Sequence, residues 1–188
     1  KEDLEGLRVL DLGTGPKIKF SKELKEAGID ADVVSFSPDF TIEEHRKTAK
    51  EVDDKTDLVA GIGQELPFDD ESFDRVMCLN VAEHLPNKKA LVDMVIEIAR
   101  VLKRKKGIGY ISPFETVLDK ENPLSGEGKD ECYEFLADSK RLADYRKKNR
   151  IKIWQEELYV TANRTGFDKK TSQSFRAPMN RIIIEKGE

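Results

Sequence analysis

Short apolar runs that alternate with amphipathic segments constrain the fold of this chain more than any other feature of its sequence. The runs lie at residues 8–12, 31–36, 57–62, 74–81 and 107–112. The run at 74–81, DRVMCLNV, is almost continuously apolar, which is typical of a strand covered on both faces. Strands of this kind, each followed by a helical pattern, predict a mostly parallel sheet with helices on both faces.

The segments between these runs carry helical patterns. Residues 18–27 place apolar side chains at helical spacing before Gly28, which suits a C-terminal cap, and residues 42–52 are polar but compatible with a helix. The clearest helix follows Asn87, whose side chain can cap it. Its apolar stripe consists of Leu91, Met94, Val95, Ile98 and Leu102.

The C-terminal third is less regular. Residues 117–150 are polar and charged, with a helical stretch near 130–148, and 153–167 is interpreted as an amphipathic helix that closes at Gly166. Two strands, about 170–176 and 180–186, are expected to meet near Pro178. The whole chain, residues 1–188, is therefore predicted to be one α/β domain with a mostly parallel, seven-stranded sheet and a C-terminal antiparallel hairpin.

Composition narrows the function classes. The chain has 188 residues, 38% of them hydrophobic and 37% charged, and a net charge of −4, so no overall basic field attracts nucleic acid. No apolar stretch approaches the roughly 20 residues that span a bilayer. The two cysteines, Cys78 and Cys132, form no disulfide framework. We expect a soluble, cytoplasmic protein without a membrane partner.

The first apolar run ends in a glycine-rich turn, within RVLDLGTGPKIKF at residues 8–20. Ligands of open α/β sheets bind beyond the carboxyl ends of the strands. Gly13 and Gly15 allow the backbone to approach a ligand closely there. The same turn could equally serve only to connect a strand to a helix, so the residues leave both interpretations open.

Further motifs favour the ligand interpretation. GQELPFDDESFDRVMCLNVAEHL, residues 63–85, follows the glycine turn, and a TGF segment before the final hairpin ends the pattern. In this order they resemble the class I S-adenosylmethionine-dependent methyltransferases, in particular those acting on small molecules. The resemblance extends from about Arg8 to Glu185. It implies a Rossmann-like methyltransferase fold, S-adenosylmethionine as cofactor and a small-molecule acceptor.

The resemblance also implies which residues contact the cofactor, since these follow the strands of the sheet. The amino-acid end would lie against Asp11, Gly13, Thr14 and Gly15, the ribose against Ser35, the adenine against Phe36, Ile62 and Gly63, and the sulfonium against Leu79 and Asn80. Glu83 and His84 would lie at the mouth of the site. His84 could act as a general base or only brace the turn after the strand.

The chain departs from the family pattern at three positions. Lys17 stands where a small residue is usual, Ser35 where a carboxylate accepts two hydrogen bonds from the ribose, and Ile62 where an aspartate often accepts from adenine. Losing the ribose carboxylate would weaken binding about tenfold to a hundredfold. Lys17 could extend into solvent or reach toward the cofactor. Asp39 could replace the lost carboxylate or only begin a helical turn.

Other chemistries lack their motifs. No Asn/Asp-Pro-Pro-aromatic segment or Pro-Cys nucleophile of a DNA methyltransferase is present, and the G-x-G-x-x-G spacing of a dehydrogenase is missing. No Cys, His or Asp grouping has metal-ligand spacing. The basic runs 103–106 and 146–150 are short and have acidic neighbours, so we interpret them as solvated helix ends rather than an RNA footprint.

Two functions remain. In the first, the chain is an enzyme whose insertion at 113–150, with its PLSGEG stretch, forms a substrate lid. Methyl transfer needs mainly positioning, so a missing general base is no objection. In the second, the chain is a non-catalytic binding or structural module that has lost its cofactor anchors. The aromatic residues Tyr110, Tyr133, Tyr145, Tyr159 and Trp154 could line a pocket or pack helices, and packing is expected for the last two.

Overall fold

A computed structural model describes residues 4–112, 136–165 and 172–187 of the chain. Its seven strands form one sheet in the order β3-β2-β1-β4-β5-β7-β6. They are β1 (Arg8–Leu12), β2 (Asp32–Phe36), β3 (Asp57–Val59), β4 (Arg75–Leu79), β5 (Ile108–Ser112), β6 (Ile151–Thr165) and β7 (Ser172–Lys186). The first five are parallel to one another, and β7 lies antiparallel between β5 and β6. The predicted mostly parallel sheet with a C-terminal antiparallel hairpin is confirmed.

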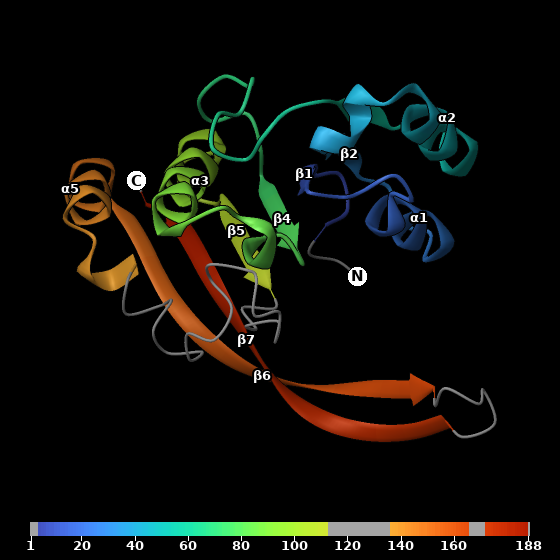
Figure 1. Cartoon of the computed structure of the whole chain (residues 1–188). Helices are drawn as coiled ribbons and strands as arrows, with labels where there is room; N and C mark the ends of the chain where they lie inside the picture. Colours follow the sequence, from blue (N-terminus) through green and yellow to red (C-terminus); the bar gives the residue numbers. More distant parts are fainter. Residues whose placement is uncertain (1–3, 113–135, 166–171, 188) are drawn as a thin grey trace.

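Helices follow the strands as the sequence pattern predicts (Figure 1). They are α1 (Lys19–Glu26), α2 (Glu43–Val52), α3 (Lys88–Val101) and α5 (Lys140–Asn149), with short 3-10 turns η1 (Pro38–Thr41) and η2 (Ala82–His84). The side chain of Asn87 accepts a hydrogen bond from the Ala90 N–H at 2.9 Å, which confirms the expected cap of α3. The whole predicted apolar stripe of α3 is buried.

The core lies mainly between α3 and one face of the sheet. On that face Leu10, Val34, Val76 and Ile111 are buried together with the α3 stripe, and Cys78 is buried among them, as expected. A smaller cluster of Ile18, Phe40 and Ala49 packs beside α1 and α2. One large core and one small cluster thus stabilise the sheet. The loops after β1, β2 and β4 lie at the carboxyl ends of the parallel strands.

The predicted helix at 153–167 is wrong, because residues 151–165 form strand β6. The sequence there alternates, with Ile151 and Ile153 buried and Lys152 exposed between them. Ile153 pairs in register with Ile184 of β7, so cross-strand apolar pairing determines the local structure instead of helical propensity. Packing of Trp154 in a helix is therefore also wrong, and Tyr159 likewise belongs to the strand.

The expected turn near Pro178 is also wrong, since β7 runs without interruption through this residue. At Pro178 strand β7 is paired with Tyr159 of β6 and has not yet reached its first pair with β5, Ile182–Ile111. A proline is tolerated where a strand has a neighbour on one side only. The two strands leave the sheet together beyond this point and form a long two-stranded extension (Figure 1).

The predicted insertion at 113–150 is described only in its last part. There α5 is capped by Ser139, whose hydroxyl accepts from the Leu142 N–H at 3.4 Å, and Leu142 is buried against the core. Arg141 forms an ion pair with Asp93 of α3, so this helix packs on the body of the domain. The candidate hinge at 123–128, together with Tyr133 and Cys132, lies outside the described residues.

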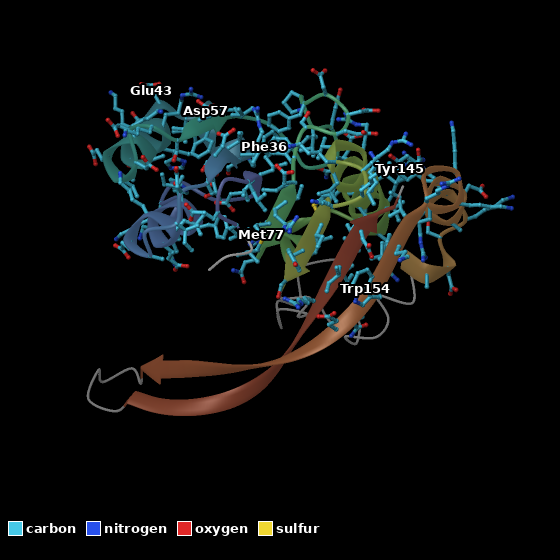
Figure 2. All side chains as sticks on the ribbon, turned by 180° about the vertical axis from the view of Figure 1, so that it is seen from behind. Phe36, Glu43, Asp57, Met77, Tyr145 and Trp154 are labelled. Atoms are coloured by element: carbon cyan, nitrogen blue, oxygen red, sulfur yellow. The ribbon has the colours of Figure 1, made fainter. Side chains whose placement is uncertain are left out.

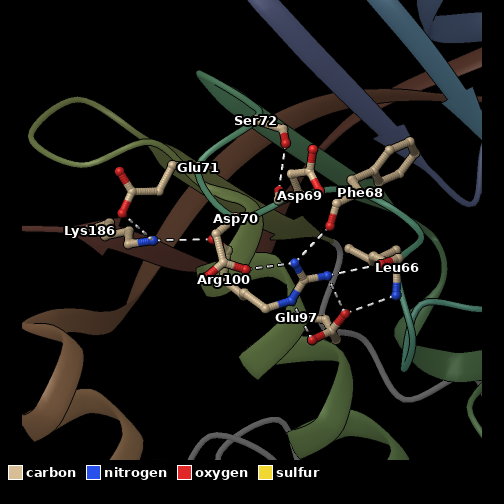
Figure 3. A network of polar contacts seen from close by, with 9 residues as sticks. All are labelled: Leu66, Phe68, Asp69, Asp70, Glu71, Ser72, Glu97, Arg100 and Lys186. Atoms are coloured by element: carbon tan, nitrogen blue, oxygen red, sulfur yellow. Dashed lines mark hydrogen bonds and ion pairs between the residues drawn. The ribbon is translucent and has the colours of Figure 1, made fainter.

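A guanidinium on α3 ties down the loop that connects β3 to β4 (Figure 3). Arg100 donates from Nε and Nη2 to both carboxylate oxygens of Glu97, from Nη1 to Asp70 and the Phe68 carbonyl, and from Nη2 to the Leu66 carbonyl, all within 2.9 Å. Glu97 in turn accepts from the Leu66 N–H at 2.9 Å. All five N–H donors of Arg100 are therefore used.

Arg100→Met is expected to lower the free energy of unfolding by about 2–3 kcal/mol, because two carbonyls and a half-buried carboxylate lose their donor. Arg104→Met is the control, since its partner Glu71 is in an exposed pair on the same loop, and it should leave stability nearly unchanged. Urea unfolding of both variants measures the difference. Equal losses in the two variants would contradict the assigned role of Arg100.

Candidate functional site

Two polar side chains are buried side by side where β1 and β2 end. Asp11 of β1 pairs in register with Ser35 of β2 and with Met77 of β4, so the three share one face of the sheet. Asp11 is 3% exposed and Ser35 is fully buried. This face is opposite to the one that α3 covers, and the pair lies at the carboxyl ends of the strands.

Three oxygen atoms in and beside this pair have no hydrogen-bond partner among the described residues. Asp11 Oδ2, Ser35 Oγ and the nearby Thr14 Oγ1 are all buried without a hydrogen bond. Buried polar groups are normally paired, and an unpaired one is costly. Burial raises the pKa of Asp11 to about 6, an effect that the nearby Thr14 hydroxyl partly offsets. The cluster therefore suits a ligand that supplies hydrogen-bond donors.

The glycine turn beside this cluster is held open by its backbone. The N–H groups of Gly13 and Thr14 donate to the Phe36 carbonyl at 2.7 and 3.3 Å, which fixes the turn against the end of β2. Gly13 has a φ of 81°, and a Cβ there would lie 2.2 Å from Val81 Cγ2, so only glycine fits. A Cβ on Gly15 would instead meet nothing within 4 Å, so the turn faces open space.

The structure places two residues near this turn whose roles the sequence left open. Lys17 is exposed, which agrees with the alternative in which its ammonium extends into solvent. Asp39 lies in η1, where its N–H donates to the Ser37 hydroxyl at 3.2 Å. Asp39 thus begins a helical turn.

The loop after β3 forms the next wall. Phe36 is 1% exposed and its ring stacks edge-on against Phe68 at 5.8 Å, so it lies in the core beneath the loop. A Cβ on Gly61 would come within 2.6 Å of the Phe36 ring, and one on Gly63 would come within 3.1 Å of Met94. Between these two close approaches Ile62 is 53% exposed. The loop therefore presents an apolar side chain to solvent at the position implied for adenine.

The segment after β4 forms the remaining side. Leu79 is half-buried, and Asn80 adopts a left-handed φ of 56° while its N–H donates to the Ser112 carbonyl at 2.9 Å. His84 is exposed at the end of η2, where its backbone N–H donates to the Val81 carbonyl. Backbone bonds thus brace this turn, and the His84 imidazole makes no hydrogen bond or ion pair within the part of the chain described.

Sequence reasoning missed two residues that shape the site. Glu97 and Arg100 hold the loop 61–70 in place, although neither was singled out from the sequence. A signal did exist, since these two opposite charges are three positions apart in a mostly apolar helix and can pair there. Nothing in the pattern indicated that backbone carbonyls of a loop distant in sequence would accept hydrogen bonds from the same guanidinium.

Two classes of feature are not found in the described part of the chain. No three His, Cys, Asp or Glu side chains gather there in a way that could bind a metal ion. No helix among those residues is both long and apolar enough to cross a membrane.

Comparison with known proteins bears on the same region. A family model described as a methyltransferase domain matches residues 10–109. The uncharacterized methyltransferase YcgJ of Bacillus subtilis (strain 168) is 31% identical over 121 residues, which is 60% of this chain and 44% of that protein. The chain thus spans less than half the length of the curated relative that it matches.

Solved structures share the fold over nearly the whole chain. An S-adenosylmethionine-dependent methyltransferase from Methanosarcina mazei gives a TM-score of 0.63 at 18% identity and covers 97% of this chain and 93% of that one. The YcgJ structure from Bacillus subtilis gives 0.61 at 16% identity, with 98% and 94% covered. At these identities the likeness concerns the fold alone.

Asp11→Asn is expected to stabilise the protein at neutral pH. The pKa of Asp11 is raised in the folded state from the usual 3.8, so ionisation favours the unfolded chain, and stability falls as pH rises from about 4 to 6. The loss amounts to about 3 kcal/mol above pH 6. Urea unfolding of both proteins at pH 4 and 7.5 should show a stability difference that grows by that order. A difference independent of pH would contradict this assignment.

Proposed function

The chain belongs to the methyltransferase-domain family, and on that premise we propose that it transfers a methyl group from S-adenosylmethionine to a small-molecule acceptor. Family and fold indicate S-adenosylmethionine-dependent methylation. The acceptor class and the contacts below belong to the proposal.

The observation that carries the proposal is the buried cluster of Asp11, Ser35 and Thr14 with three unpaired oxygen atoms. These residues fit the cofactor, which brings an ammonium group and ribose hydroxyls as donors. Asp11 would accept from the amino-acid end and Ser35 from the ribose, while the open face of Gly15 leaves room for the chain between them. Ile62 would cover the adenine ring with apolar surface.

When bound, S-adenosylmethionine supplies an activated methyl group, so the protein has mainly to bind and orient the reactants. Leu79 and Asn80 would shield the transferred methyl from water at the end of β4. Asn80 suits this position because its backbone bond to Ser112 fixes the turn. His84 would serve as a base for acceptors that lose a proton, since its imidazole is exposed at the rim.

A small-molecule acceptor is supported by the charge of the chain. The net charge of −4 disfavours a nucleic-acid acceptor, which would require phosphate contacts. A cytoplasmic location is part of the proposal. A lid formed by 113–150 stays a prediction.

A second function is favoured by one specific observation. Ser35 offers a single hydroxyl where a carboxylate would accept two hydrogen bonds, and Ile62 offers no acceptor. A scaffold that no longer binds the cofactor would tolerate both changes. Cofactor binding therefore separates the two functions.

Calorimetric titration with S-adenosylhomocysteine should show micromolar binding that strengthens about tenfold between pH 5 and 7.5. The ligand's ammonium favours ionised Asp11, whose pKa of about 6 in the free protein makes deprotonation part of binding at low pH. Asp11→Asn is the matched control and should bind weakly with little dependence on pH. The absence of heat and of a thermal shift at millimolar ligand would instead support the non-catalytic scaffold.

Restoring the two family acceptors should tighten binding. Ser35→Asp adds a charged acceptor for the ribose and is expected to strengthen binding about tenfold to a hundredfold. It should also destabilise the free protein, because the new carboxylate would be buried opposite Asp11. Ile62→Asp is expected to strengthen binding without that cost, since this position is half-exposed. Unchanged affinity in the double variant would refute the assignment of both positions.

A further inference from the structure

A cavity of about 290 Å³ lies on the same face of the sheet as Asp11, displaced toward β5 and β7. Its lining consists of Leu4, Arg75, Met77, Leu79, Tyr110 and Ser112, together with Arg181. We propose that this cavity binds the methyl acceptor and that the acceptor is a small molecule with an apolar ring and one anionic group. This inference rests on the proposed function and adds to it a substrate class.

The register of the sheet connects this cavity to the cofactor cluster. Met77 is paired with Asp11 on one side and with Tyr110 on the other, so the three form a continuous row across β1, β4 and β5. Leu79, the last residue of β4, is paired with Ser112 and lies at the rim of the same cavity. A ring that lies on Met77 and Tyr110 would therefore reach the position implied for the methyl group at Leu79.

The floor of the cavity is apolar and its size is limited. Met77, Leu79 and Tyr110 provide a thioether, an isobutyl group and an aromatic ring, which pack well against a flat apolar ligand. A volume of about 290 Å³ is near the lower end of the roughly 300–1,000 Å³ that small-molecule sites occupy. One or two rings fit there.

The charges at the cavity are positive. The guanidinium of Arg181 lies 5.1 Å from the centroid of the Tyr110 ring and donates from Nε and Nη2 to one oxygen of Glu156, at 3.1 and 2.7 Å. Its Nη1 donors have no partner in the described part of the chain, so they can bind an anion. Glu156 and Tyr110 therefore fix the position of the Arg181 side chain, and its Nη1 group stays available to a ligand.

The second guanidinium is that of Arg75, at the start of β4. Arg75 donates from Nη1 to the Asp74 and Lys106 carbonyls, each at 2.8 Å. Both acceptors are neutral, and no carboxylate lies at ion-pair distance from Arg75 within the described residues. An apolar floor between two guanidinium groups matches a ring that carries a carboxylate, sulfonate or phosphate.

A second, larger hollow differs in both place and chemistry. It measures about 390 Å³ and is lined by residues at the start of β2 and β3, the opposite end of the strands from the cofactor cluster. Its polar side chains bond to one another, since Ser21 and Thr56 both meet Asp53 within 3.0 Å. The cavity beside Met77 is therefore the one that fits an acceptor.

Calorimetry with 2-naphthoate, in the absence of cofactor, tests the inference. The full chain is expected to bind this aromatic acid at least tenfold more tightly than 2-naphthalenemethanol, a neutral analogue of the same size. The fluorescence of Trp154 provides a second readout, because it is the only tryptophan of the chain and is paired with Ile183, which is itself paired with Tyr110. Figure 2 shows its place on β6 and that of Met77 in the sheet.

Two variants of one ion pair separate recognition from structural support. Arg181→Gln should weaken 2-naphthoate binding at least fivefold and leave binding of the alcohol within twofold. Glu156→Gln should strengthen 2-naphthoate binding two- to fivefold, because it frees the guanidinium from its competitor. Lys47→Gln on the exposed side of α2 is the control for net charge and should change neither affinity. If the pair only supports the hairpin, both variants will weaken both probes, and the inference is wrong.

A parallel titration with S-adenosylhomocysteine keeps this inference distinct from the proposed function. If that ligand binds and 2-naphthoate does not, the acidic-acceptor pocket is refuted and the proposed function stands. If 2-naphthoate binds as expected and S-adenosylhomocysteine does not, the proposed function fails, and the assignment of the cavity to a methyl acceptor fails with it.

Discussion

The five hydrogen bonds of Arg100 are the interaction on which the candidate site depends most. The guanidinium extends from α3, the best-packed helix of the domain, and holds the carbonyls of Leu66 and Phe68 together with two carboxylates. Because burial alone would raise the pKa of Glu97, the donors from Arg100 and the Leu66 N–H are what keep that pKa low and the carboxylate ionised. The loop 61–70 is thereby attached to the rigid core, and with it Ile62, at the position proposed for the adenine contact.

The residues of the site lower the stability of a domain that is otherwise well packed. Asp11 and Ser35 occupy positions in a central sheet where apolar side chains would pack without cost, and Asp11 Oδ2 and Ser35 Oγ lack partners among the described residues. A folded domain retains such groups when a ligand satisfies them, since buried unpaired polar atoms otherwise reduce its stability. The site is continuous with the neighbouring cavity through the sheet register. The row of Asp11, Met77 and Tyr110 crosses three adjacent strands and changes from a polar to apolar side chains.

The terminal hairpin completes this arrangement at the β6 edge of the sheet. Insertion of β7 between β5 and β6 places Arg181 beside Tyr110 and Trp154 beside Ile183, so residues more than 70 positions apart in the chain form one wall. Lys186, at the end of the same strand, donates to the Arg100 carbonyl at 3.1 Å. The hairpin therefore contacts both the proposed acceptor cavity and the network that positions the loop after β3.

Much of this molecule follows from its sequence alone. Apolar runs with helical segments between them determine the five parallel strands and the α3 stripe, because burial on both faces leaves few other arrangements, and the glycine turn after β1 marks the ligand edge. The strand character of 151–165 was not determined locally, since its helical and alternating patterns compete and only pairing with Ile182–Ile184 resolves them. The contacts of Arg100, the burial of Asp11 against Ser35 and the cavity at Met77 likewise arise from residues distant in sequence. Tertiary structure decided these, because each depends on which neighbours the sheet register brings within bonding distance.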